Sequence, residues 1–173
     1  MLSNFSIRHL SVIISFAIAI FWNFSFLAAT DQEQLGQLSI PSIGIETSIV
    51  LAPLGSRTWE VSHLDMTVGY FQHLQWFGSN GNVVLGGHST DSFGNPEVFY
   101  NLKNVQIGDS ITAFVDDQTY VYVVTEIHNI DYQDMSVALP TDDARLTLIT
   151  CDTTSYTGFH YTRRDVVIAT RTN

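Results

Sequence analysis

The sequence contains few basic residues and a single cysteine. Of its 173 residues, 7 are Lys or Arg and 17 are Asp or Glu, and all of the acidic residues lie after Thr30. An acidic surface repels phosphate backbones, which argues against nucleic-acid binding. One cysteine cannot form a disulfide within the chain, and the paired Cys and His spacings of structural zinc sites are missing. The sequence therefore gives no support for a metal site.

Proline and glycine are also scarce, with 4 and 11 residues, whereas hydrophobic residues make up 45% of the chain. This composition argues against disorder and predicts a buried core. No internal repeat or low-complexity tract is present. The length fits one folded domain preceded by a targeting segment.

Residues 10–29 form an apolar stretch with no charged side chain. As a helix this stretch would span roughly 30 Å, which is enough to cross a bilayer core. Arg8 precedes it and acidic residues follow it, so the positive-inside rule places the N-terminus in the cytoplasm. We therefore expect a single-pass protein of the cell membrane with its folded domain outside the cell. The expected segments are a cytoplasmic N-terminus (1–9), a transmembrane anchor (10–29), a linker (30–37) and a catalytic domain (38–173).

A cleaved signal peptide is the alternative for the same stretch. Cleavage after Ala29 would place Leu27 at a position that requires a small residue, and the stretch is longer than a usual signal-peptide core. An uncleaved anchor is therefore favoured.

The rest of the chain shows short strand patterns and no long helical period. Asp116 and Asp117 separate two alternating segments, as in a hairpin. Many short strands at short intervals predict a closed or sandwiched β architecture. Strands are expected at 38–40, 43–45, 48–51, 82–85, 111–115, 120–127, 145–151 and 165–170, and one or two helical turns are expected at 97–103.

Cys151 ends the strand-like segment 147–151 (TLITC). An unpaired thiol outside the cytoplasm is open to oxidation, so this residue is a candidate nucleophile. The alternative is a small buried apolar cysteine. Alternation places Leu146, Leu148 and Thr150 on one face of the strand and Ile149 and Cys151 on the other. Since both faces carry apolar residues, we expect a central strand.

A reactive cysteine needs a base or a cation nearby, because the thiolate is the attacking species. His88 directly follows an apolar strand that ends in two glycines, which places an imidazole at a strand exit. The alternative for His88 is a turn cap that bonds only to the backbone. Arg163 and Arg164 begin the last expected strand, and an arginine beside the thiol would stabilise an oxyanion. The alternative is an exposed pair of arginines.

Three segments together resemble the sortase family. Residues 147–151 (TLITC) resemble the TLxTC signature, residues 86–88 (GGH) resemble the catalytic histidine segment, and residues 164–169 (RDVVIA) resemble the arginine strand. The similarity extends over most of residues 38–170 and includes the segments IPSIGI, FYNL and IGDSI.

The resemblance implies an all-β fold, a sortase-type eight-stranded β-barrel with short helices. It also implies that Cys151 is the nucleophile and that His88 is the general acid and base. Arg164 would bind substrate and stabilise the oxyanion. It is preferred to Arg163 because it lies thirteen positions after Cys151 and shares a face with the apolar residues of its strand. Thr150 is expected to help bind the sorting motif.

The activity implied by the resemblance is that of a cysteine transpeptidase. Such an enzyme cleaves an LPXTG-like sorting signal of a secreted protein between Thr and Gly, and transfers the acyl group to an amine of a peptidoglycan precursor or a pilin. A hydrolytic cysteine protease and a non-catalytic membrane-anchored β-domain are the alternatives. The sequence resembles the housekeeping or the class D and class E branches. No cofactor is expected, and the calcium site of one branch cannot be mapped onto this chain. Trp59, Trp76 and Phe77 are expected to be core residues.

Overall fold

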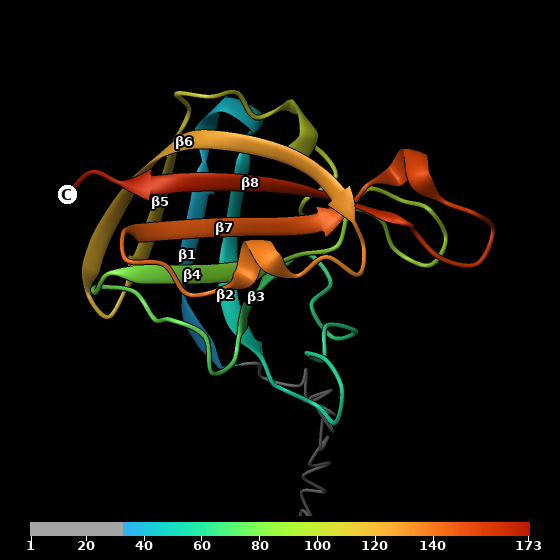
Figure 1. Cartoon of the computed structure of the whole chain (residues 1–173), viewed down its shortest axis with the longest axis horizontal. Helices are drawn as coiled ribbons and strands as arrows, with labels where there is room; N and C mark the ends of the chain where they lie inside the picture. The colour runs from blue at the N-terminus through green and yellow to red at the C-terminus, as the bar shows by residue number, and fades with distance from the viewer. Residues whose placement is uncertain (1–32) are drawn as a thin grey trace, which may run out of the picture. The chain divides into compact units, whose positions relative to one another are not determined.

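The computed structural model of the chain describes residues 33–173, in which eight strands close into one barrel (Figure 1). The strand order around the barrel is β1-β2-β3-β4-β7-β8-β6-β5. The pairs β2–β3 and β4–β7 are parallel and the others are antiparallel. The strands are β1 (Gln34–Ile40), β2 (Ile45–Ala52), β3 (Val68–Phe71), β4 (Gly81–Gly86), β5 (Ser110–Val115), β6 (Gln118–Asp131), β7 (Ala144–Cys151) and β8 (Arg163–Arg171).

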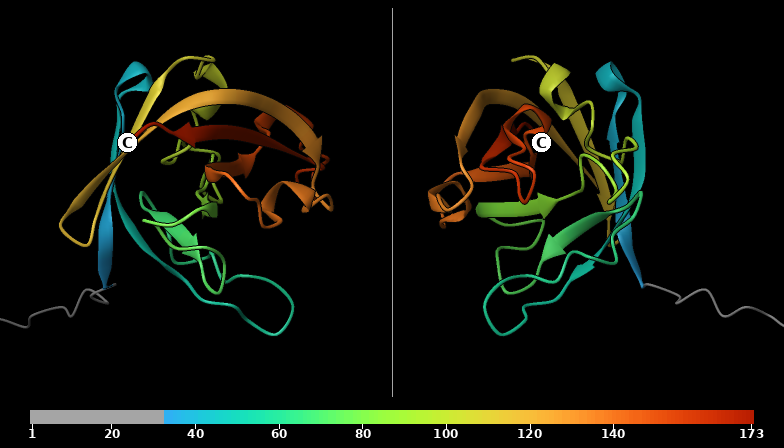
Figure 2. Two further views of the ribbon diagram at one scale, coloured as in Figure 1. Left: turned by 60° about the vertical axis from the view of Figure 1, so that its left-hand side comes forward. Right: turned by 90° about the vertical axis from the view of Figure 1, so that its right-hand side faces the viewer.

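The connections between the strands contain only short 3-10 helices, each of three residues. This arrangement confirms the expected all-β eight-stranded barrel with short helices. The curvature of the closed sheet is clearest in Figure 2. The helices are η1 (Pro41–Ile43), η2 (Leu102–Asn104), η3 (Ser136–Ala138) and η4 (Thr153–Ser155).

The expected cytoplasmic segment (1–9) and membrane anchor (10–29) lie outside the described residues. Within residues 33–173, no helix combines the length and the apolar character needed to cross a bilayer. Strand β1 begins at Gln34, so residues 34–37 of the expected linker belong to the barrel. Its pairing with β2 and β5 uses backbone N–H and C=O groups and therefore tolerates polar side chains at these positions.

Most of the remaining expectations agree with the structure. The strand expected at 43–45 does not form as such, because Ile43 ends η1 and Gly44 adopts a left-handed conformation, so that β2 begins at Ile45. Asp116 and Asp117 form the two-residue turn between β5 and β6, with φ of 52° and 59°. Positive φ at both central residues is the geometry that suits a tight hairpin. Val98, Phe99 and Leu102 are buried as expected, although regular helix is confined to η2. Strand β3 was not expected, and β6 continues past 127 to Asp131.

Strand β7 contributes to two apolar clusters. Leu146 and Leu148 belong to the cluster that fills the barrel, and Ile149 belongs to a second cluster with Val166 and Ile168 of β8. Each fully buried side chain of this kind contributes about 1.5–3 kcal/mol to folding. Both faces of β7 are thus covered, as its sequence predicts, and the position of the strand is fixed from both sides.

The chain directions of β4, β7 and β8 bring three termini to one end of the barrel. Because β4 and β7 are parallel, both end there, and the antiparallel β8 begins there. Figure 1 shows β7 and β8 side by side, with long loops extending beyond their ends. The residues that immediately follow β4, end β7 and start β8 are therefore neighbours.

Candidate active site

Cys151 is the last residue of β7 and lies directly opposite Arg164 on β8. The preceding pair on this face is Ile149 with Val166, which belongs to the second apolar cluster. Cys151 and Arg164 are therefore on the face of the strands that points away from the barrel interior. Both side chains are partly buried.

The candidate residues meet in a pocket of about 160 Å³ at this end of the barrel. The structure brings His88, Cys151, Arg164 and Thr150 together in its wall, although they come from three different segments of the chain. The pocket is lined by Val61, Leu64, Phe71, Gly86, Gly87, His88, Ile149, Thr150, Cys151 and Arg164.

The two glycines before His88 are needed for close packing. A Cβ atom on Gly86 would lie 2.6 Å from the ring of Phe71, and one on Gly87 would lie 2.7 Å from the ring of Phe99. Real Cβ atoms do not approach other atoms so closely, so either ring would have to move. The small residues thus allow β4 to exit between two aromatic side chains and to place His88 at the pocket.

The imidazole of His88 bonds to the loop that joins β2 and β3 (residues 53–67). Its Nε2 atom lies 2.8 Å from the main-chain carbonyl oxygen of Val61. Because a carbonyl oxygen can only accept, Nε2 carries the proton in this bond. Within residues 33–173, Nδ1 has no hydrogen-bond partner. It is therefore the ring nitrogen that is free to exchange a proton in the pocket.

Contacts with Phe71 at the end of β3 and with Gln72, which follows it, hold this β2–β3 loop in place. The ring of Trp59 stacks on that of Phe71, with centroids 4.8 Å apart and an interplanar angle of 11°. Its Nε1 donates to the main-chain oxygen of Gln72 at 2.9 Å, and the Gln72 side chain accepts from the amide of Leu54 at 2.9 Å. The sequence predicted a core role for Trp59, and no local pattern indicated that it lies beside the pocket. Phe77 packs in the barrel core as expected, whereas Trp76 is only partly buried and packs against that core.

Thr150 fixes the end of β7 to the residue before His88. Its hydroxyl donates to the carbonyl oxygen of Gly87 at 2.8 Å, and only 3% of the residue is exposed. The structure therefore gives Thr150 a positioning contact between the Cys151 strand and the His88 segment. Its expected contact with a sorting motif stays a prediction.

The two adjacent arginines point to different surroundings. Arg164 lines the pocket, and its Nη1 donates to the carbonyl oxygens of Tyr161 and Arg163 at 3.1 and 3.0 Å. Its guanidinium also lies over the ring of Tyr132, 5.9 Å from the centroid. Arg163 instead donates to the side-chain and main-chain oxygens of Asn129. Among residues 33–173, Arg164 is therefore the arginine whose positive charge acts on Cys151. Its expected role in binding substrate and stabilising the oxyanion stays a prediction.

Opposing effects act on the pKa of the Cys151 thiol. Burial raises the pKa of Cys151, the Arg164 guanidinium lowers it, and the Asp165 carboxylate raises it, so that the net pKa is above the ordinary value. At neutral pH the free protein therefore holds mainly a neutral thiol. Formation of the nucleophilic thiolate requires transfer of this proton.

A polar network supports the strand ends behind the pocket. The side-chain amide of Asn129 on β6 donates to Asp152 at 3.0 Å and to Asp165 at 2.7 Å. Asp152 also accepts from the amide and hydroxyl of Thr154 and thereby caps the N-terminus of the short helix η4. The network thus links the residues that directly follow Cys151 and Arg164. Within residues 33–173, no three His, Cys, Asp or Glu side chains gather as a metal ion would require.

A second pocket of about 190 Å³ continues the first. The two share Val61, Phe71, Ile149 and Arg164, so together they form one groove. Apolar side chains dominate its walls, and the thiol and the imidazole both lie at one end. Such a groove suits an extended peptide whose reacting bond lies over the sulfur. The remaining walls are Thr58, Trp59, Ile130, Tyr132, Asp134, Met135 and Val137.

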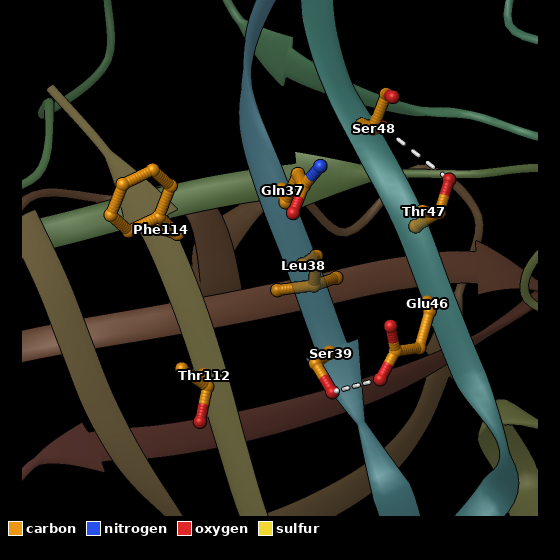
Figure 3. Close-up of a pocket in the computed structure, with 8 residues that line it drawn as sticks. All are labelled: Gln37, Leu38, Ser39, Glu46, Thr47, Ser48, Thr112 and Phe114. Carbon is orange, nitrogen blue, oxygen red and sulfur yellow. Dashed lines mark hydrogen bonds between the residues drawn. The ribbon is translucent and has the colours of Figure 1, made fainter. Parts of the chain in front are cut away.

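A larger hollow of about 370 Å³ lies over β1, β2 and β5 (Figure 3). The figure shows the side chains of three adjacent strands, with hydroxyl groups and one carboxylate, Glu46. Ser39 donates to Glu46 at 3.3 Å. No cysteine or histidine lines this larger hollow. The chemistry therefore favours the smaller groove. The hollow is lined by Gln37, Leu38, Ser39, Glu46, Thr47, Ser48, Thr112 and Phe114.

Two curated proteins have sequences similar to this chain. Sortase A of Listeria monocytogenes serovar 1/2a is 31% identical over 118 residues, which cover 68% of this chain and 49% of that protein. Sortase D of Bacillus subtilis strain 168 is 27% identical over 135 residues, covering 78% and 62%. The chain thus spans about half to three-fifths of the length of these curated relatives.

A solved structure and a family model also match this chain, and both are of sortases. The structure of a lid mutant of sortase A from Corynebacterium diphtheriae superimposes with a TM-score of 0.68 at 26% identity, covering 83% of this chain and 72% of that one. The family model of the sortase domain matches residues 38–172. This chain therefore belongs to the sortase family.

Proposed function

We propose that this protein is a membrane-anchored cysteine transpeptidase. It cleaves an LPXTG-like sorting signal of a secreted protein between Thr and Gly. It then transfers the acyl group to an amine of a peptidoglycan precursor or a pilin. The observation that carries the proposal is the single pocket lined by Cys151, His88 and Arg164, which continues into an apolar groove.

In the first step, the sulfur of Cys151 attacks the carbonyl carbon of the threonine. The proton of the thiol passes to His88, and a carbon–sulfur bond forms. His88 then returns the proton to the departing nitrogen as the carbon–nitrogen bond breaks. The products are a thioester on Cys151 and a free amine on the released peptide. Covalent catalysis of this kind divides one difficult acyl transfer into two easier ones.

In the second step, the nitrogen of an acceptor amine attacks the thioester carbon. His88 takes a proton from the nitrogen, the carbon–sulfur bond breaks, and the sulfur recovers a proton. A new amide bond therefore replaces the thioester and the enzyme is regenerated. With water as the acceptor, the same sequence gives a carboxylic acid.

Arg164 acts on the oxygen of the reacting carbonyl in both steps. Negative charge develops on this oxygen in each tetrahedral intermediate, and a fixed guanidinium stabilises it. Arg164 is held by main-chain carbonyl groups, and no carboxylate in the described part of the chain forms an ion pair with it. The charge remains available to the substrate.

An N-terminal anchor would place this chemistry where its substrates emerge. The proposed orientation has residues 1–9 in the cytoplasm and the barrel outside the cell. Protease digestion of intact cells with the wall removed tests it, because an external barrel is degraded and an internal one is protected.

The activity is tested with the full chain in detergent, an LPXTG peptide and an amine. We expect an acyl-enzyme adduct by mass spectrometry, a ligated product, and loss of both on Cys151→Ala substitution. Cleavage without ligation at any amine concentration would identify a hydrolytic protease. No adduct with any sorting motif tested, and a Cys151→Ala variant equal to the wild type in ligand binding, would favour a non-catalytic domain.

A further inference from the structure

Tyr161 joins the two loops that leave the active site. Its hydroxyl lies 2.8 Å from the hydroxyl of Thr90, and its main-chain carbonyl accepts from Arg164 at 3.1 Å. Thr90 lies two residues after His88 in the β4–η2 loop (residues 87–101). One residue thus connects the segment after His88 with the guanidinium beside Cys151. The two loops extend from the same end of the barrel in Figure 1.

The β7–β8 loop (residues 152–162) is otherwise held by contacts within itself, by β8 and by the end of β6. At β6, Asn129 donates to Asp152 at 3.0 Å, and the amide of Tyr132 donates to the carbonyl oxygen of Thr162 at 3.0 Å. Tyr156 pairs with Tyr161 across the loop, with ring centroids 5.0 Å apart, and its hydroxyl donates to Gly158 at 3.0 Å. Thr157 bonds to the carbonyl of His160 through its amide and its hydroxyl. Between the described residues of the two loops, the contact of Thr90 with Tyr161 is the one hydrogen bond. It therefore determines how the loops are held together.

The two loops border the acceptor side of the site. The apolar groove leads from Arg164 toward Tyr132 and Met135, and His88 does not line that part. His88 lines only the end that contains Cys151. Since His88 exchanges protons with the departing and the arriving amine, both amines lie at the His88 end. Thr90 lies two residues after His88, and Tyr161 lies three residues before Arg164. Both residues are therefore at the end of the groove where the amines lie.

We infer that the hydrogen bond between Thr90 and Tyr161 is a latch that selects amine over water as the acceptor. It holds the loop after His88 against the loop that carries Arg164. An arriving amine then meets a defined wall and an oriented guanidinium. Water needs no such wall, so loss of the latch reduces aminolysis more than hydrolysis. Tyr161 is in this respect a positioning residue. The inference rests on the proposed transpeptidase function.

The test uses the full chain in detergent with a sorting peptide, an amine and four variants. Tyr161→Phe and Thr90→Val each remove one partner of the hydrogen bond, and the double variant removes both. Tyr156→Phe is the matched control, because it removes a hydroxyl from the same loop without touching the β4–η2 loop. A net hydrogen bond of ordinary strength corresponds to about a twofold to tenfold effect.

We expect the ratio of ligated to hydrolysed product to fall by about this factor in each single variant, and to fall no further in the double variant. Tyr156→Phe should keep the wild-type ratio. Equal ratios in Tyr161→Phe and Tyr156→Phe, or effects of the two latch variants that simply add, would overturn the latch.

A second measurement does not depend on turnover. The alkylation rate of Cys151 by iodoacetamide reports the thiolate, which the charge of Arg164 favours. We expect about twofold to fivefold slower alkylation in Tyr161→Phe and no change in Tyr156→Phe, since only the former releases the Arg164 loop. If the wild type forms no thioester with any sorting peptide, the proposed function fails, and this comparison still decides whether Tyr161 positions Arg164. Equal rates in both variants would reject that role.

Discussion

Cys151 and Arg164 are direct cross-strand partners at the ends of two antiparallel strands. Directly opposed residues in such a pair have Cβ atoms about 4.5–5.5 Å apart, which is close enough for their side chains to interact. Regular strands hold a reactive group more firmly than loops do. The register between β7 and β8 is therefore the structural basis of the site, and a change of one residue would place Arg164 on the opposite face.

Replacement of Arg164 by Gln should raise the pKa of Cys151 further. Burial already raises this pKa, and the Arg164 guanidinium is the charge that opposes the effect. Without it, less thiolate is present at any pH below the thiol pKa, so alkylation should slow and its pH midpoint should move upward. Loss of oxyanion stabilisation should also lower kcat by about 10²–10³-fold. The pH dependence of iodoacetamide alkylation and a ligation assay measure the two effects.

Arg163→Gln is the matched control, since Arg163 contacts Asn129 and does not line the pocket. Its alkylation midpoint should stay at the wild-type value. An equal shift in both variants would show that the effect depends on general charge and not on the cross-strand position.

Replacement of Thr150 by Val should loosen the connection between β7 and the His88 segment. Valine has nearly the same shape but cannot donate to the carbonyl of Gly87, which loses its partner at a largely buried position. We expect a loss of about 1–3 kcal/mol in the free energy of unfolding, measured with urea. Thr150→Ser retains the hydroxyl and should recover most of this loss. Serine and valine variants of equal stability would contradict the positioning role.

Local patterns predicted the parts of the site that regular strands determine. The alternation of apolar residues in 145–151 indicated a strand covered on both faces, and burial of Leu148 and Ile149 in separate clusters agrees with this. The glycines before His88 indicated an imidazole at a strand exit, and the structure adds that the rings of Phe71 and Phe99 leave no room for a side chain at either glycine. Residue type and position at strand ends made Cys151, His88 and the two arginines candidates, and the resemblance to the sortase motifs grouped Cys151, His88 and Arg164 into one site. Their catalytic roles stay predictions.

Contacts between distant loops could not be predicted in the same way. Strand β3 has four consecutive buried residues without alternation, and it is defined by its pairing with β2 and β4. Trp59 stands in a loop whose path depends on Phe71 and Gln72. Tyr161 bonds to Thr90, 71 positions away. No local periodicity reports such contacts, because tertiary packing alone creates them.

Replacement of Gln72 by Met should release His88 from the β2–β3 loop. The Gln72 side chain accepts from Leu54 but does not line the groove, so its loss acts through the loop alone. We expect faster solvent exchange of the Nε2 proton of His88 in NMR spectra, because the carbonyl of Val61 is held less firmly. The ligation rate should fall by about twofold to tenfold.

The conservative variant Gln72→Glu keeps an oxygen acceptor for the amide of Leu54. It should have the wild-type exchange rate of the His88 Nε2 proton and the wild-type ligation rate. Ser56→Ala, an exposed change in the same loop, should have no effect. Unchanged exchange of the His88 proton in Gln72→Met would show that the loop does not position the imidazole through this contact.

Acid should destabilise the end of β7 through Asp152. Burial alone raises the pKa of Asp152, but hydrogen bonds from Thr154 and Asn129 and the charge of Arg163 together bring it below the ordinary value. A carboxyl group whose pKa is lowered by folding stabilises the fold above its unfolded-state pKa, which is about 3.9 for aspartate. This contribution is lost as the pH falls through the lower folded-state value. Urea unfolding should therefore show a difference in the free energy of unfolding between wild type and Asp152→Asn at pH 7, and this difference should narrow below about pH 4.

The exposed Asp142→Asn change is the control, and its free energy of unfolding should follow that of the wild type at every pH. Because Asp152 directly follows Cys151, a constant gap from pH 7 to pH 3 would mean that the ionised carboxylate does not hold the nucleophile's strand in place.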